Sequence, residues 1–180
     1  CNMEKKVMVL EKSRCVGCSA CVIACKEENR VPDGKFRDWV TTETDGKYPR
    51  LTQKHYSERC NHCASTPCVR SCPTGASHII EGGIVKVTHE ECIGCGACIQ
   101  SCPYDARYSH PEGWVDKCTF CDHRVKNGQD PACVSVCPTY CMYFGDIDDP
   151  NSVISKIIAT GKIKVLAPEV GTKPQIFYLI

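Results

Sequence analysis

Cysteine is the most informative residue type in this sequence, since 18 of the 180 residues are Cys and a thiol can form a disulfide or bind a metal. Sixteen of them fall into four groups of four, with most neighbours two or three residues apart. The groups are Cys15-x2-Cys18-x2-Cys21-x3-Cys25, Cys60-x2-Cys63-x4-Cys68-x3-Cys72, Cys92-x2-Cys95-x2-Cys98-x3-Cys102 and Cys118-x2-Cys121-x11-Cys133-x3-Cys137. Thiolates at this spacing can reach a common centre, so each group predicts a metal site.

Three kinds of site could use such groups. A disulfide framework needs cysteines set apart on the chain, and a bridge across two residues is strained. A zinc site uses two Cys-x2-Cys pairs and needs neither a third close cysteine nor a fourth followed by Pro. The run C-x2-C-x2-C-x3-C-P is that of bacterial ferredoxins and holds a [4Fe–4S] cluster. The sequence therefore predicts four [4Fe–4S] clusters in two ferredoxin-like pairs.

The elements expected around the cysteines are tight loops and short helices. Three glycines stand where a loop near a cluster needs a backbone without Cβ: Gly17, Gly94 and Gly96. The fourth cysteine of each group is expected on the helix that follows, pointing to the other cluster of its pair. Prolines end three of these helices, at positions 73, 103 and 138.

Composition excludes several classes of function. The 22 Lys and Arg nearly balance the 21 Asp and Glu, and no basic block stands out, so nucleic acid is a poor candidate partner. No apolar run approaches the roughly 20 residues of a membrane span. Aromatic residues are only 7%, so the apolar core must be thin and the clusters must replace part of it. Each loaded cluster with four thiolates carries roughly −2 when oxidised, which makes the loaded chain acidic.

Secondary-structure signals between the motifs are short. We expect a strand over 5–10, a helix over 19–29, and loop over 30–55 with at most one strand near 51–57. A hairpin of 77–80 and 84–87 should turn at Gly82-Gly83. Asp149-Pro150 predicts a helix N-terminus and Gly161 its end, and strands are expected over 162–166 and 175–179. The fold class is therefore α+β with loop-rich connections.

Three further segments, together with the four motifs, carry a family resemblance. They are Cys102–Tyr108, Cys118–Arg124 and Gly171–Tyr178. The sequence resembles the iron–sulfur subunit of the dimethyl-sulfoxide-reductase family of molybdoenzymes, most of all the electron-transfer subunit of polysulfide and thiosulfate reductases. The selenate and arsenate reductase partners are similar. The resemblance covers nearly the whole chain.

The resemblance implies a role in anaerobic respiration. The family subunit is not catalytic alone and has no direct membrane span. It relays electrons from an integral-membrane quinol-oxidising subunit to a molybdopterin catalytic subunit that reduces a sulfur, selenium or arsenic compound. Family complexes lie at the outer face of the cytoplasmic membrane, where a twin-arginine-exported partner carries the folded small subunit; the cytoplasmic face is the alternative. A polyferredoxin-like subunit of a formate dehydrogenase or hydrogenase is the competing function.

The resemblance also implies nested pairing of the motifs, the first with the fourth and the second with the third. The implied ligand sets are Cys15, Cys18, Cys21 and Cys137; Cys25, Cys118, Cys121 and Cys133; Cys60, Cys63, Cys68 and Cys102; and Cys72, Cys92, Cys95 and Cys98. Sequential pairing would use the same sixteen cysteines and stays open. All four cysteines of the third motif are present, so no [3Fe–4S] centre is expected.

Nested pairing divides the chain into two ferredoxin-like modules and a tail. The first module is 1–55 plus 111–148, the second is 56–110, and 149–180 is a C-terminal extension. The extension holds no ligand and ends in five apolar residues, 176–180, so we expect it to dock on a partner. The alternative is that these residues cover the chain's own core.

Several residues near the motifs are not predicted ligands. Cys141 is expected to be a buried small side chain near a cluster. Cys1 is expected to follow an upstream segment, and a processed, lipid-bearing end is the alternative. His62 and His123 lie inside cysteine loops and either shield a cluster or donate a hydrogen bond to it. Three aromatic residues could pack or line an electron path: Trp39, Tyr104 and Trp114.

Overall fold

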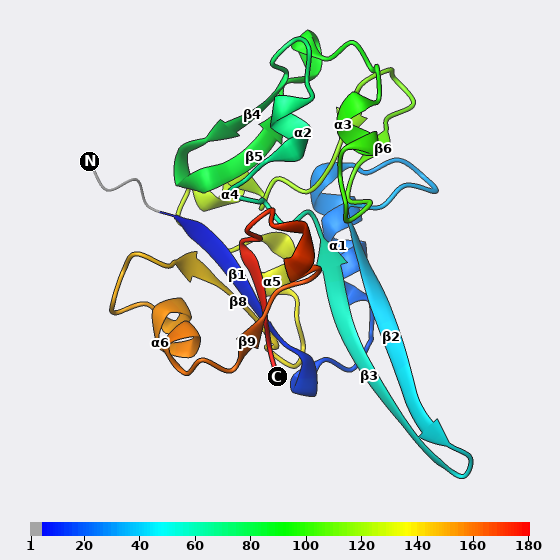
Figure 1. Cartoon of the computed structure of the whole chain (residues 1–180), viewed down its shortest axis with the longest axis vertical. Coiled ribbons are helices and arrows are strands. Elements are labelled where there is room, and N and C mark those ends of the chain that lie inside the picture. The colour runs from blue at the N-terminus through cyan, green and yellow to red at the C-terminus, as the bar shows by residue number, and fades with distance from the viewer. Residues whose placement is uncertain (1–4) are drawn as a thin grey trace.

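A central sheet of four strands organises the chain (Figure 1). The computed structural model describes residues 5–180, so Cys1 lies outside the described residues. The order of the strands is β8-β1-β10-β9, with β1 at Lys6–Glu11, β8 at Met142–Asp146, β9 at Ile163–Lys164 and β10 at Ile176–Leu179. Strand β1 pairs antiparallel with β8 and parallel with β10. The mixture of helices and strands agrees with the predicted α+β class.

The sheet separates a helix from the layer that holds most of the cysteines. Alternate side chains of a strand point to opposite faces, and both faces of β1 are buried. Val7 and Val9 pack against Ile154 of helix α6 (Val153–Ala159). Met8 and Leu10 face the other way and share a core with cysteines of the first, second and fourth motifs. The strand that precedes the first motif therefore anchors the metal-binding layer.

The cysteine motifs run through five short helices. They are α1 (Ala20–Asn29), α2 (Pro67–Arg70), α3 (Ala97–Gln100), α4 (Asp122–Val125) and α5 (Ala132–Ser135). Four 3-10 turns connect other elements: Lys12–Arg14, Glu81–Gly83, His89–Glu91 and Pro168–Val170. Of the fourth cysteines, only Cys25 lies on a helix; Cys72, Cys102 and Cys137 follow the ends of α2, α3 and α5. That expectation was therefore wrong for three motifs, because a residue before Pro avoids the helical conformation.

Two of the smaller strand pairs lie near the second and third motifs. Strands β4 (Ser77–Ile80) and β5 (Ile84–Val87) form the predicted hairpin, and Gly82 has a positive φ of 79° at its turn. Strands β6 (Tyr108–Ser109) and β7 (Val115–Asp116) form a shorter pair. The hairpin predicted from the glycine doublet is therefore confirmed.

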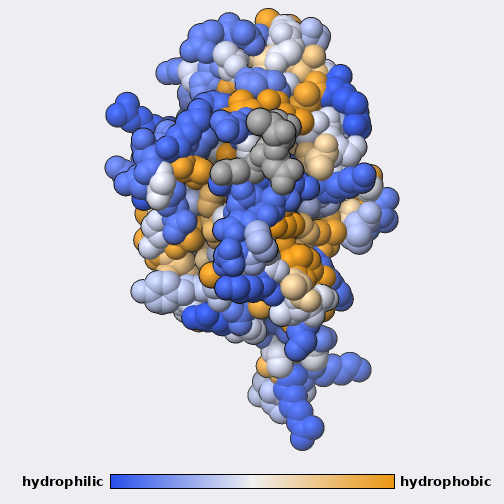
Figure 2. Space-filling model, turned by 90° about the vertical axis from the view of Figure 1, so that its left-hand side faces the viewer, coloured by the Kyte–Doolittle hydropathy of each residue, from blue (hydrophilic) through white to orange (hydrophobic). Residues whose placement is uncertain are grey.

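Most of the segment predicted as loop belongs to a long β-hairpin, so the loop prediction was wrong from residue 38 onward, whereas the strand expected near 51–57 is confirmed. Strands β2 (Asp38–Lys47) and β3 (Arg50–Arg59) pair along their whole length and stand out from the body as an arm (Figures 1 and 2). Gly46 and Pro49, which we interpreted as loop residues, lie at its tip. The first residues of β2 include Trp39, Val40 and Thr41, types that favour extended backbone. Figure 2 shows the end of the arm as mostly hydrophilic.

The C-terminal segment packs on its own chain. Helix α6 begins three residues later than predicted, because the backbone N–H of Ser155 donates to the side chain of Ser152, the N-cap, at 3.1 Å. Strand β10 lies between β1 and β9, and its Ile176 and Tyr178 are buried. The apolar end thus covers the core of this chain, which is the alternative to docking that the sequence left open. The division into modules stays a prediction.

Deletion of residues 174–180 tests the importance of this strand. Removing β10 uncovers β1 and the core around Met8 and Tyr56, so we expect an insoluble chain that has lost iron. Removal of the exposed Ile180 alone is the control and should change neither solubility nor iron content. A soluble truncated chain with full iron content would contradict the packing described above.

Candidate iron–sulfur centres

Four sets of predicted ligands define four candidate sites, which we name centres A to D. Centre A is Cys15, Cys18, Cys21 and Cys137; centre B is Cys25, Cys118, Cys121 and Cys133; centre C is Cys60, Cys63, Cys68 and Cys102; centre D is Cys72, Cys92, Cys95 and Cys98. Each set takes three cysteines from one motif and the fourth from its nested partner. The structure gives the surroundings of each set.

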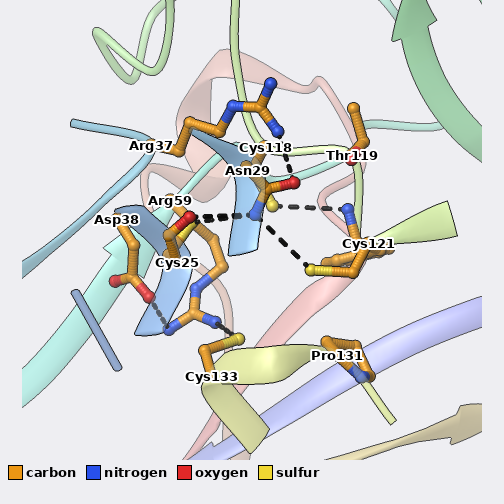
Figure 3. A pocket seen from close by; sticks show the side chains of 11 residues that line it. Cys25, Asn29, Arg37, Asp38, Arg59, Cys118, Thr119, Cys121, Pro131 and Cys133 are labelled. Carbon is orange, nitrogen blue, oxygen red and sulfur yellow. Dashed lines mark hydrogen bonds and ion pairs between the residues drawn. The ribbon is translucent and has the colours of Figure 1, made fainter. Parts of the chain in front are cut away.

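All four cysteines of centre B line one pocket (Figure 3). Cys25 comes from α1, and the others come from the segment between β7 and the end of α5. The side-chain amide of Asn29 lies 3.7 Å from the sulfur of Cys25 and 3.8 Å from that of Cys121. Its nitrogen is a hydrogen-bond donor to both sulfurs.

The four cysteines of centre A line a second pocket. This pocket also contains Cys141. Its position follows from the central sheet, in which Leu10 pairs with Met142. That register places the start of the first motif beside the end of the fourth. Neither pocket is lined by a cysteine of the second or third motif.

Centre C is drawn together by the packing of its loops. The pKa of Cys63 is raised to about 11, chiefly by burial; a hydrogen bond with Thr172 lowers it, and the nearby Cys60, Cys68 and Cys102 contribute to the rise. Burial likewise raises the pKa of Cys102, with Cys60 and Cys68 again nearby. Cys60 and Cys68 therefore lie close to both Cys63 and Cys102.

Centre D is more open. Cys98 and Cys92 pack with Val85 and Val115, and Cys95 is exposed. Burial raises the pKa of Cys98, and Cys72 is among the charges that raise it further. Helix α2 packs against α3, and the hydroxyl oxygens of Ser71 and Ser101 beyond their ends lie 2.9 Å apart. Cys98 of α3 and Cys72, which follows α2, therefore lie on neighbouring segments.

Backbone donors point at several of these sulfurs. The N–H of Phe120 donates to Cys118, that of Val115 to Cys92 and that of Ser77 to Cys72, each at 3.4 Å. Such bonds stabilise a negatively charged sulfur more than a neutral thiol. Iron–sulfur sites use this kind of support, because hydrogen bonds to sulfur set their reduction potential.

The glycines of the loops fit the same purpose. Gly94 has a φ of 67°, and a Cβ there would lie 2.3 Å from the carbonyl oxygen of Gly113. At the matching position of the first motif, a Cβ on Gly17 would lie 2.9 Å from the ring of His55. Both positions need a residue without a side chain, as the motif predicts.

The donor set suits a cluster better than a single ion. In residues 5–180 no three His, Cys, Asp or Glu side chains converge closely enough to hold one metal ion. Cluster thiolates each bind a different iron and so stand further apart than the ligands of a single tetrahedral ion. The residues therefore fit the [4Fe–4S] group, which supplies one-electron chemistry when bound.

Burial makes these thiols poor ligands until a metal arrives. It raises the pKa of Cys118 and of Cys133 to about 12, although Arg59 lowers both values. At neutral pH the free thiols of these two cysteines are therefore protonated. Metal binding must displace their protons, which couples loading to folding.

Comparison with known proteins decides the family. Two family models, both described as 4Fe-4S dicluster domain, match residues 14–76 and 51–147. The sequence is 44% identical to the B polypeptide of polysulfide reductase from Wolinella succinogenes, over 97% of this chain and 94% of that protein. The chain belongs to the iron–sulfur subunits of the dimethyl-sulfoxide-reductase family.

Two further relatives of this iron–sulfur subunit agree. It is 43% identical to the B polypeptide of tetrathionate reductase from Salmonella typhimurium, over 96% of this chain and 71% of that protein. It is 34% identical to the arsenate respiratory reductase iron–sulfur subunit of Shewanella sp. strain ANA-3, over 96% of this chain and 94% of that protein.

The comparisons confirm several predictions for this subunit. Two dicluster domains give four [4Fe–4S] clusters in total, as the motifs predicted. The subunit transfers electrons within a reductase complex and is not catalytic alone. Separately from the comparisons, no helix in the described part of the chain is long and apolar enough to span a membrane. The assignment of each cysteine to one centre stays a prediction.

Residues outside the ligand sets take different places in this subunit. The sulfur of Cys141 lies 3.4 Å from that of Cys137, beside centre A. His62 is buried, and its Nδ1 accepts the backbone N–H of Val85 at 3.0 Å. Burial, with nearby cations, holds the pKa of His62 well below its usual range, so the ring is neutral. His123 lies at the surface and pairs with Glu28 at 2.7 Å.

The three aromatic residues pack against neighbours. Trp114 stacks on His110 and His89, with ring centroids 4.3 and 4.7 Å apart. The hydroxyl of Tyr104 lies 2.5 Å from that of Thr172. Trp39 and Tyr104 both pack against the main core.

Sequence reasoning missed the buried cations near the centres. Arg59, Lys117 and Arg107 are almost completely buried. Two of them directly precede a predicted ligand in the sequence, since Arg59 is followed by Cys60 and Lys117 by Cys118. That adjacency was the signal that could have revealed them.

Two serine substitutions test the ligand assignment. Cys68→Ser removes a predicted ligand of centre C, so we expect the loss of one cluster and of thermal stability. Cys141→Ser is the matched control, since it removes a buried thiol beside a centre and should keep all four clusters. Iron content and thermal unfolding of the two purified variants provide the measurement. Equal iron loss in both would show that the ligand set is wrong.

Proposed function

We propose that this subunit relays electrons from a membrane quinol-oxidising subunit to a molybdopterin catalytic subunit in an anaerobic respiratory reductase. The proposed acceptor is a compound of sulfur, selenium or arsenic. The proposed location is the outer face of the cytoplasmic membrane, as a peripheral subunit carried with a twin-arginine-exported partner. The names of the relatives, which include polysulfide, tetrathionate and arsenate reductases, support this class of acceptor.

The exposure of two ligands carries the proposal. Cys18 of centre A and Cys95 of centre D are exposed, whereas every cysteine of centre B is buried. A relay needs an accessible centre for each of two partners and covered centres between them. Centres A and D meet the first need, and centre B meets the second.

Each exposed cysteine also has an apolar neighbour at the same position of its loop. Val16 is 60% exposed and Ile93 is 66% exposed, and each stands two residues before the exposed cysteine. Exposed aliphatic side chains around a functional group are typical of a protein interface. These two loops are therefore the proposed contacts for the two partner subunits.

A competing function keeps the relay but changes the complex. The chain would then be a polyferredoxin-like subunit of a formate dehydrogenase or hydrogenase. The purified complex distinguishes the two, because one reduces a sulfur, selenium or arsenic compound and the other oxidises formate or hydrogen. The side of the membrane follows from protease accessibility of the subunit in intact cells and in inverted vesicles.

We expect the loaded subunit to contain about 16 iron and about 16 acid-labile sulfide per chain, four of each per cluster. It should copurify with a molybdenum-containing subunit. The measurements are metal analysis and sulfide determination on anaerobically purified complex. A subunit that contains zinc and no iron, or only two clusters after reconstitution, would contradict the proposal.

Single charge substitutions test the two docking loops. Val16→Glu and Ile93→Glu should keep full iron content, and each should weaken copurification of a different partner. Ile79→Glu on strand β4 changes another exposed aliphatic side chain, away from both loops, and is the control. Loss of the same partner in both loop variants would contradict the assignment of two ends.

A further inference from the structure

Four Arg and Lys side chains are buried in residues 5–180; Arg37 pairs with Asp116 beside centre B, and the other three lie near predicted ligands of two centres. Arg59 and Lys117 are each 1% exposed, and Arg107 is 4% exposed. Burying a charge is costly unless an opposite charge lies close by. Among residues 5–180, neither Lys117 nor Arg107 has a carboxylate partner. Their surroundings show which negative groups stand near each cation.

Arg59 lies between centres A and B. Its Nη1 donates to the sulfur of Cys133 in centre B at 2.8 Å (Figure 3). Its Nη2 donates to the hydroxyl of Ser57, which also accepts the thiol of Cys21 in centre A at 3.7 Å. Asp38 pairs with Arg59 at 3.1 Å and offsets part of its charge. This cation therefore contacts centre B directly and centre A through one intervening hydroxyl.

Lys117 lies between centres B and C. Its ammonium donates to the carbonyl oxygen of Val85 and, at 2.6 Å, to that of Cys118, a ligand of centre B. Burial lowers its pKa, while Cys60 of centre C and Cys118 oppose that shift. The loops of the two centres touch at this point.

The contact between those loops is a ring stack. His62, inside the cysteine loop of centre C, stacks on Phe120 of the centre B loop with centroids 3.8 Å apart. Val85 connects the contact to Lys117, since its N–H donates to His62 and its carbonyl accepts from the ammonium. The ammonium thus sits where the loops of the two centres meet.

Arg107 lies between centres C and D. Its Nη2 donates to the hydroxyl of Ser77 at 2.9 Å, and its other two nitrogens have no hydrogen-bond partner in the described residues. Burial would lower its pKa, but the charges of Cys68 and Cys60 in centre C and of Cys98 in centre D outweigh that effect. Ser77 also donates its backbone N–H to the sulfur of Cys72 in centre D at 3.4 Å, so Arg107 reaches that centre through one residue, and the influence of Cys68 and Cys60 places centre C nearby.

We propose that the four centres form the series A, B, C, D and that each of the three junctions holds one buried cation that stabilises negative charge on both of its neighbours. The inference rests on the proposed relay function. A positive charge in a poorly polarisable interior favours the reduced form of a nearby group. One cation shared by two centres therefore raises the reduction potentials of both.

The test is a redox titration of the four-cluster subunit followed by electron paramagnetic resonance. Lys117→Met and Arg107→Met should each lower two of the four potentials, and they should share one of the two, which is centre C. At a fixed potential the ratio of reduced to oxidised centre should fall about tenfold, or about 59 mV for a one-electron couple. The comparison rests on which potentials shift in both variants, so the electron paramagnetic resonance signals do not have to be assigned to centres beforehand.

The first junction needs a paired substitution. Arg59→Met alone would leave Asp38 buried without a partner, so it is combined with Asp38→Asn. The double variant should lower two potentials, share one with Lys117→Met and share none with Arg107→Met. Lys54→Met, an exposed lysine on the arm, is the control and should leave all four potentials unchanged.

The outcomes separate this inference from the relay itself. A wild-type subunit without four clusters contradicts the proposed function. Four clusters whose potentials do not change, change equally in every variant, or change for only one centre overturn the shared cations. If Lys117→Met loses iron, Lys117→Gln, which keeps a donor for the Val85 carbonyl, is titrated in its place and must show the same overlap.

Discussion

The burial of thiols in place of an apolar core is the constraint on which this structure depends. A chain with few aromatic residues devotes sixteen cysteines to four sites, and most of those sulfurs are shielded from water. Without metal, such sites leave thiols beside buried cations, and these contacts stabilise the fold less than packed apolar side chains would. With metal, the same groups become a charged framework in which sulfur, iron and basic residues balance one another. Stability and electron transfer thus rely on the same atoms.

The central sheet explains how distant motifs come to share a site. Strand β1 runs into the first motif, and β8 leaves the fourth, so their antiparallel pairing brings the two ends together. The helices do little of this work, since four of the five that carry the motifs are a single turn long. A short strand pair therefore fixes the geometry of a site whose ligands lie far apart in the sequence.

Much of the site and part of the fold could be predicted from the sequence. The cysteine spacing indicated the cofactor because few metal groups need that pattern. Gly82-Gly83 indicated a turn because two consecutive residues with positive φ are rarely anything but glycine. The arm was missed because its glycine and proline stand at the tip of a hairpin, where they resemble loop residues. The buried cations were missed because a sequence shows that a lysine is charged but not where its charge lies.

The parallel pairing of β10 with β1 has a consequence for how this subunit is made. Strand β1 is synthesised first, yet both of its partners lie in the C-terminal part of the chain. Pairings of such long sequence separation form slowly and cannot begin before translation is nearly complete. The central sheet beside centre A is therefore complete only in a full-length polypeptide. A chain that ends before β10 lacks the strand that pairs with β1 on this side of the sheet.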